Sequence, residues 1–330
     1  MTTGPTSELV RNSSTASTQQ NPWRLAARAA GLVLLALLVA ALLGPGRQNM
    51  TNYRSAVGAQ QPSTLVLDGI SISYTDSGGS GLVVICLHAI GHGARDFEDL
   101  SRRLSPQYRV IALDFPNQGN SDPDSQPASA TRYTQILAQC IDKLHLPGVV
   151  LLGNSIGGAV SIRYASQHPE LVKAIVLCDS GGLGPPGPLG HIFIGAFVQF
   201  FAAGRRGAFW FPWAFGRCYR KVLLKPAAHE QRDRIIRSAY EVAPTLEQAW
   251  RSFNRPEENL ASLLPHVRCP VLLAWAKDDF VVPLKRSAPS FQVFPYHRLE
   301  VFEGGHAAFL EDPGRFELAL RGFLNQVCAV

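Results

Sequence analysis

The stretch GNSIGG, at residues 153–158, decides the fold of this chain. Apolar, β-branched residues precede it and predict a strand, and residues 158–169 have a helix-like pattern. A sharp turn from strand to helix would hold Ser155 under strain and expose its hydroxyl at the helix N-terminus, which favours developing negative charge. Flanking glycines let the strand and the helix approach closely. We therefore predict Ser155 as a nucleophile, the alternative being a serine in an ordinary glycine-rich turn.

A serine hydroxyl needs a base before it can attack a carbonyl carbon. Nine histidines are available, and His306 stands out because it ends the loop EGGH directly after the last predicted strand. His88 lies in a different loop, His145 on a polar face, and His168 at the end of a helix before a proline. We expect these three to be structural and predict His306 as the base.

The acid that orients the histidine is expected in the loop KDDFVVP, residues 277–283. This loop leaves the carboxyl end of the predicted strand at residues 271–276, and such ends gather the ligand-binding loops of a parallel sheet. Both Asp278 and Asp279 lie in it. An acid at this place gives the order Ser, Asp, His along the chain.

Short apolar runs alternate with helical patterns along much of the chain. The expected strands are two that turn at Asp68-Gly69, and then residues 82–87, 109–113, 148–153, 173–178, 271–276 and 298–302. The expected helices cover residues 96–104, 133–145, 156–167 and 313–326. Continuous apolar strands separated by helices indicate an α/β fold, with a mostly parallel sheet covered on both faces.

Residues 181–262 interrupt this pattern and predict an inserted cap or lid between two parts of the core, residues 63–180 and 263–330. The interruption opens with the loop-forming run GGLGPPGPLG and then gathers nine aromatic residues between Phe193 and Phe215. Three uses fit these rings: lining an apolar pocket, forming a small core, or contacting a membrane together with the interleaved arginines.

The first 62 residues predict three segments. Residues 1–24 are rich in Ser, Thr, Gln and Asn and are expected to be disordered, and residues 47–62 read as a linker. Between them, residues 25–46 include the uncharged run GLVLLALLVAALL, which nearly reaches the roughly 20 residues that span a bilayer. The run predicts a single-pass membrane anchor with the main domain outside the cytoplasm. The alternative is a cleaved signal segment and a secreted or periplasmic protein.

The composition suits a packed globular domain, since 46% of the residues are hydrophobic, 17% are charged and the net charge is +6. Basic residues form no stripe interleaved with base-stacking aromatics, so we expect no nucleic-acid partner. The six cysteines are scattered singly, which favours buried free thiols over disulfides. With no CxxC or Cys/His cluster, we expect no metal and no cofactor.

Together the motifs resemble those of the α/β-hydrolase superfamily, in the branch with an inserted helical cap, over residues 64–326. Residues 305–313, GHAAFLEDP, are similar to the family's histidine loop. The family's acid loop often reads Gly-x-x-Asp-x-x-x-Pro, and matching on Pro283 implies that Asp279 is the acid. Some relatives carry the acid at the end of an earlier strand, which makes Asp179 the alternative.

The resemblance also implies an oxyanion hole made by the backbone N–H groups of Ile90 and Ile156. Ile90 lies in the loop LHAIG, residues 87–91, two positions beyond a histidine as the donor does in relatives. We call this loop the oxyanion loop. Ala89 replaces the glycine that usually follows that histidine.

These residues imply a serine hydrolase that cleaves a carboxylic ester through an acyl-enzyme on Ser155. The motif also resembles hydrolases that cleave carbon–carbon bonds in meta-cleavage products, although the tryptophan usual after their histidine is Ala307 here. Lactonase, thioesterase and acyltransferase activities stay open, as does a non-catalytic ligand-binding role. The expected partner is a small molecule with an apolar or aromatic acyl group, and the oligomeric state is left open.

Overall fold

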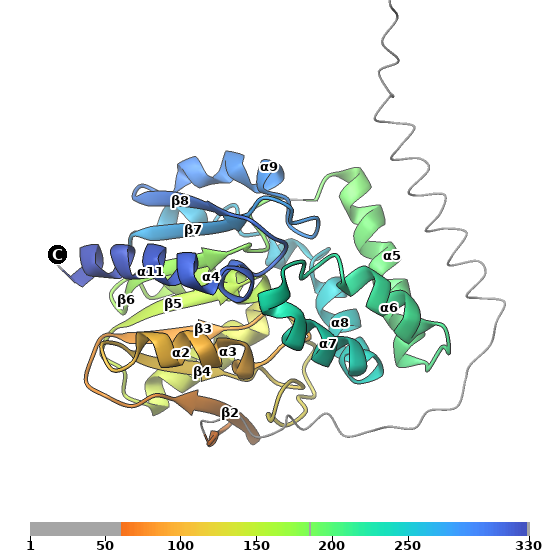
Figure 1. The fold of residues 1–330 in the computed structure, drawn as a ribbon, viewed down its shortest axis with the longest axis horizontal. Helices are drawn as coiled ribbons and strands as arrows, with labels where there is room; N and C mark the ends of the chain where they lie inside the picture. The colour runs from red at the N-terminus through yellow and green to blue at the C-terminus, as the bar shows by residue number, and fades with distance from the viewer. Residues whose placement is uncertain (1–60, 185, 329–330) are drawn as a thin grey trace, which may run out of the picture. The chain divides into compact units, whose positions relative to one another are not determined.

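The computed structural model describes residues 61–184 and 186–328, which form an eight-stranded sheet with helices packed on it (Figure 1). The strands are β1 (Ser63–Leu67), β2 (Ile70–Asp76), β3 (Val83–Leu87), β4 (Arg109–Leu113), β5 (Val149–Asn154), β6 (Val172–Cys178), β7 (Val271–Ala276) and β8 (His297–Phe302). They lie in the order β1-β2-β4-β3-β5-β6-β7-β8. β2 runs antiparallel to both of its neighbours, and the other neighbouring strands are parallel.

The middle of the sheet forms the core because its strands are apolar throughout. Every residue of β3, β5 and β7 is buried. Successive side chains of a strand point to opposite faces, so both faces of the sheet are covered. The predicted mostly parallel sheet is therefore confirmed. The predicted turn between β1 and β2 is present too, with positive φ angles of 50° at Asp68 and 78° at Gly69.

Helices link the strands and cover them. They are α2 (Glu98–Leu104), α3 (Ala130–Lys143), α4 (Ile156–Gln167), α5 (Pro188–Arg205), α6 (Phe211–Tyr219), α7 (His229–Arg237), α8 (Ala239–Ser252), α9 (Leu284–Ser287), α10 (Ala308–Glu311) and α11 (Pro313–Cys328). α3 packs against α4, and α2 packs against α11. The short 3₁₀ helix η1 (Ala94–Phe97) leads into α2.

The helices α5 to α8, which we call the cap, stand between β6 and β7 in the chain and lie together beside the sheet (Figure 1). α5 packs against α8, where the ring centroids of Phe197 and Trp250 are 4.5 Å apart. Phe211 and Phe215 of α6 are buried. Part of the aromatic run thus forms a core within the cap.

The structure corrects the prediction of a single-pass membrane protein with its main domain outside the cytoplasm. Across residues 61–184 and 186–328, no helix combines the length and the apolar character needed to cross a bilayer. Even α5 has 18 residues and includes His191, Gln199 and Arg205, whereas a span needs about 20 mostly apolar residues. The predicted segment itself, residues 25–46, lies outside the described residues, as does the predicted tail. The membrane location is therefore withdrawn.

The junction of β5 and α4 depends on two glycines. A Cβ atom on Gly153 would lie 2.2 Å from the carbonyl oxygen of Gly157, and one on Gly157 would lie 2.2 Å from the carbonyl oxygen of Leu87. Both collisions are with backbone atoms, which cannot rotate away as a side chain can. The close approach of α4 to the sheet therefore requires glycine at both positions.

Gly157→Ala is expected to lower the free energy of unfolding by about 1–3 kcal/mol, the range for overpacking a tight site. The reason is the collision of the new methyl group with the backbone of β3. Gly322→Ala in α11 is a matched control, because a Cβ atom there meets nothing within 4 Å and alanine is the better helix former. Urea unfolding of both variants measures the difference, and equal midpoints for Gly157→Ala and the wild type would contradict the expectation.

Candidate active site

Ser155 occupies the turn between β5 and α4 with φ 55° and ψ −115°, a conformation that residues with a Cβ atom rarely adopt. Its N–H donates to the carbonyl of Cys178 at 3.0 Å, and its carbonyl accepts the N–H of Gly181 at 3.0 Å. Both partners lie at or just beyond the end of β6. The neighbouring strand therefore holds the turn in its strained form.

The imidazole of His306 is hydrogen-bonded to the carboxylate of Asp279, with 2.8 Å between Nδ1 and Oδ2. Both side chains are buried. The other oxygen of Asp279 accepts the N–H groups of Val281 at 2.7 Å and Val282 at 3.1 Å, so its own loop fixes the carboxylate. Burial disfavours the charged imidazole, but the Asp279 carboxylate outweighs it and raises the pKa of His306 above its usual value.

Asp179, the alternative acid, directly follows β6 and is fully buried. Its Oδ1 accepts the N–H of Ala276 at 2.8 Å, while its Oδ2 has no hydrogen-bond partner within the described part of the chain. Burial, and after it the nearby carboxylate of Asp279, raises the pKa of Asp179 well above its usual value. Of the two candidate acids, it is Asp279 that bonds to the imidazole.

Asn154 was not among the predicted site residues, yet its side chain joins the two halves of the site. The buried Nδ2 group donates to the carbonyl of His306 at 2.8 Å and to that of Cys178 at 3.0 Å. It thereby ties the loop that carries the imidazole to the strand ends beside Ser155. A polar residue at the end of an otherwise apolar strand was the signal in the sequence, because buried amides are normally hydrogen-bonded.

The histidine loop, residues 305–313, is fixed from the side of the cap. The N–H of His306 donates to the carbonyl of Val222, just beyond α6, at 2.7 Å. Glu311 accepts three backbone N–H groups at 2.9 to 3.2 Å, those of Gly305, Leu224 and Lys225. This acid was also missed, although it lies within the motif that indicated His306, because only the folded chain brings the cap to it.

The oxyanion loop is held by the buried ring of His88. Its Nδ1 pairs with the carbonyl of Ala89 at 2.7 Å, and its Nε2 accepts the N–H of Phe115 at 3.0 Å. Burial lowers the pKa of His88 to about 4, so the ring is neutral and can make both contacts. The N–H of Gly91 donates to Gln118 Oε1 at 2.6 Å and holds the other end of the loop.

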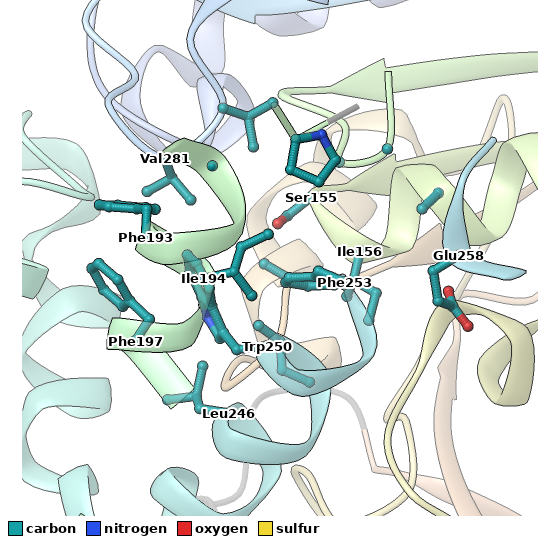
Figure 2. Close-up of a pocket in the computed structure, with 18 of the residues that line it drawn as sticks. Ser155, Ile156, Phe193, Ile194, Phe197, Leu246, Trp250, Phe253, Glu258 and Val281 are labelled. Atoms are coloured by element: carbon teal, nitrogen blue, oxygen red, sulfur yellow. The ribbon is translucent and has the colours of Figure 1, made fainter. Parts of the chain in front are cut away.

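One cavity of about 390 Å³ brings the predicted residues together. Ser155, His306, Ile90 and Ile156 all line it. Figure 2 shows the hydroxyl oxygen of Ser155 among largely apolar side chains, most of them from the cap: Phe193, Ile194, Phe197, Leu246, Trp250 and Phe253. Within the described ranges, no group of three or more His, Cys, Asp or Glu side chains is placed to hold a metal ion.

The chain is similar in sequence or in fold to several known proteins. The chain is 27% identical to a 2-hydroxy-6-oxononadienedioate/2-hydroxy-6-oxononatrienedioate hydrolase of a Pseudomonas species, covering 77% of this chain and 92% of that protein. It is 25% identical to an uncharacterized protein of Mycobacterium tuberculosis, and the match covers 75% of this chain and 76% of that protein. A thermophilic esterase of Thermogutta terrifontis shares the fold, with a TM-score of 0.70 and 22% identity over 81% of this chain and 99% of the esterase.

The model of one family, described as the alpha/beta hydrolase family, matches residues 84–319. The match begins in β3 and ends in α11, so it includes the strand ends that carry Ser155, Asp279 and His306 as well as the cap. The resemblance noted in the sequence is thereby confirmed, and with it the predicted fold. This chain belongs to the alpha/beta hydrolase family.

Proposed function

We propose that this protein is a serine hydrolase that cleaves a carboxylic ester through an acyl-enzyme on Ser155. One observation carries the proposal. Ser155, on its strained turn, and His306, hydrogen-bonded to buried Asp279, line the same apolar cavity. These are the three side chains that nucleophilic acyl transfer requires, in the order typical of the family.

In the proposed mechanism Asp279 holds Nδ1–H of His306, which leaves Nε2 as the basic nitrogen. Nε2 takes the hydroxyl proton as Ser155 Oγ attacks the ester carbonyl, and the oxyanion is stabilised by the N–H groups of Ile90 and Ile156. The imidazolium then gives its proton to the leaving alcohol, and the acyl-enzyme forms. A water molecule repeats the sequence, releasing the carboxylic acid and restoring Ser155.

The cavity supports a small substrate with an apolar or aromatic acyl group. Its volume of about 390 Å³ lies in the lower part of the range for small-molecule sites. The stacked rings of Phe197 and Trp250 form part of the wall on the cap side. An acyl chain or ring that displaces water from such a wall gains the hydrophobic contribution of its buried area.

A second candidate is hydrolysis of a carbon–carbon bond in a meta-cleavage product. The Pseudomonas relative named for such a reaction covers most of this chain. Ala307 argues against this second candidate. It directly follows His306 and is buried, whereas hydrolases of that kind usually have tryptophan at this position. The ester reaction therefore remains the first proposal.

A fluorophosphonate probe should label the purified chain on Ser155, because the probe reacts with a serine that an adjacent base activates. Ser155→Ala should abolish the labelling, as measured by intact mass. Ser166→Ala, in the helix α4 that follows Ser155, is a matched control, since Ser166 is not among the residues that line the cavity, and it should label like the wild type. Labelling that survives in Ser155→Ala would exclude the proposed nucleophile.

Asp279→Asn should lower kcat by about 10³–10⁴-fold, because asparagine favours the wrong tautomer of the imidazole. Asp179→Asn should change kcat by less than about threefold, because Asp179 is bonded to the N–H of Ala276 and burial favours its uncharged form. Steady-state hydrolysis of p-nitrophenyl butyrate measures both. A large loss of kcat in Asp179→Asn, with little change in Asp279→Asn, would instead identify Asp179 as the acid.

The rate should fall on the acid side as His306 becomes protonated and can no longer accept the serine proton. Since Asp279 raises the pKa of His306 above 6.5 despite burial, the midpoint of that fall in kcat/KM should also lie above 6.5. In Asp279→Asn the residual activity should show a lower midpoint, because the largest contribution that opposes the effect of burial on the pKa of His306 is then lost. A wild-type midpoint at or below 6.5 would contradict the assignment of His306 as the base.

A further inference from the structure

The cavity that holds Ser155 meets the protein surface at an end that carries two arginines. A side chain that lines the cavity and is also exposed to solvent lies at the mouth of the cavity, and Arg255 and Arg286 meet both conditions. Arg255 follows α8 in the chain, and Arg286 lies in α9. The proposed ester reaction uses neither guanidinium group.

The beginning of α5 connects the two arginines. A Cβ atom on Gly190, in the first turn of α5, would lie 3.9 Å from Nη1 of Arg286. The ring of the next residue, His191, is hydrogen-bonded to Asn254, with 2.8 Å between Nδ1 and Oδ1. Asn254 directly precedes Arg255, and neighbouring Cα atoms are about 3.8 Å apart. Both arginines therefore lie beside the start of α5, at the same end of the cavity.

The side chain of Arg286 reaches this place because position 184 is a glycine. A Cβ atom on Gly184 would lie 2.8 Å from Cγ and 3.3 Å from Cδ of Arg286. The aliphatic part of the arginine thus packs on the loop that follows β6, and its charged end continues toward α5. A side chain that is already held by packing loses less conformational entropy when it binds a ligand.

Neither guanidinium group has a hydrogen-bond or ion-pair partner among the residues that the structure describes. Two other arginines near the cap show the contrasting arrangement, since Arg205 and Arg251 are both ion-paired to Glu247, at 2.6 and 2.8 Å. The positive charges of Arg255 and Arg286 are thus free to meet a ligand that enters the cavity.

The cavity lining holds no negative charge that would cancel these two. Among the described residues that line it, Glu258 is the only one with a carboxylate, and it is buried. Its Oε2 lies 3.8 Å from Nη2 of Arg163, and its Oε1 accepts the N–H of Thr131 at 3.3 Å. The mouth is therefore positively charged, and a cleft with charges of one sign attracts ligands of the opposite sign.

We propose that Arg286, together with Arg255, binds a carboxylate that the substrate carries at the end remote from the scissile bond. A guanidinium group suits a carboxylate because it can donate two parallel hydrogen bonds to it. The rest of the lining is largely apolar, which suits an apolar chain between the two ends of the substrate. This inference rests on the proposed ester hydrolysis and names its substrate class, esters that end in a carboxylate.

The carboxylate can be carried by the acyl chain or by the alcohol, so the test compares two pairs of esters at about pH 8, where a carboxylate is ionised. One pair is monoethyl adipate and its neutral isostere ethyl adipamate, and the other is 6-acetoxyhexanoate and 6-acetoxyhexanamide. In at least one pair the wild type should prefer the anionic ester by about fivefold in kcat/KM, the upper end for an exposed ion pair. The preference should come mainly from a lower KM.

Arg286→Gln should bring the ratio of anionic to neutral ester close to one, and Arg286→Glu should invert it, because like charges repel. Lys285→Gln and Lys285→Glu are the matched controls. They change the charge by the same amounts at the adjacent exposed residue, which is not among those that line the cavity. These controls should keep the wild-type ratio.

Raising the salt concentration from about 0.1 M to about 1 M should also lower the wild-type ratio, because the screening length falls from about 10 Å to about 3 Å. A wild-type ratio of one or less in both pairs would overturn the proposal without any variant. So would a preference that Arg286→Glu leaves unchanged, or one that Lys285→Glu lowers to the same extent, since the charge of the whole surface would then explain it.

A binding experiment separates this inference from the proposed reaction. Calorimetric titration of the Ser155→Ala variant with each pair of esters reports the preference for the anion without any turnover. Tighter binding of the anionic ester, lost on adding Arg286→Glu, supports the carboxylate site even if the fluorophosphonate probe fails to label Ser155. Equal binding within both pairs, in a protein that the probe does label, overturns the carboxylate site and leaves the ester reaction standing.

Discussion

The left-handed backbone of Ser155 is the constraint on which the rest of the site depends. A φ of 55° costs a residue with a Cβ atom about 1–3 kcal/mol. Backbone hydrogen bonds to Cys178 and Gly181 offset that cost, and they exist only because β6 lies beside β5 in the sheet. The turn is so tight that α4 almost touches β3, which leaves room for glycine alone at position 157. The motif around Ser155 is thus a consequence of packing.

The cap does more than close a cavity, because it holds both loops that face the nucleophile. Val222 and the two residues that bond to Glu311 lie just beyond α6, and they fix the backbone of the histidine loop. On the other side, Tyr219 and Arg234 reach the segment that follows the oxyanion loop. A displacement of the cap would therefore move the imidazole and the oxyanion loop together.

The sequence predicted what short stretches determine by themselves. Apolar runs such as residues 271–276 and the strained turn at Ser155 are local patterns, and the strands and helices they indicated are present. Asn154 and Glu311 escaped prediction because their partners lie far along the chain, at His306 and in residues 224–225. The apolar run at residues 25–46 shows the opposite case, in which a strong local pattern led to a membrane location that no described helix supports.

Two carboxyl groups, those of Asp179 and Asp279, lie near the imidazole of His306. Their surroundings differ in how well they stabilise a negative charge. Two like charges in a buried site disfavour each other, so the group whose surroundings stabilise the negative charge better is the one that carries it more readily. Asp279 accepts two backbone N–H groups and bonds to His306, all of which stabilise its negative charge. Asp179 has a single N–H partner and complete burial. Burial therefore favours the uncharged form of Asp179, whereas Asp279 bonds to the imidazole and raises the basicity that the proposed attack by Ser155 requires.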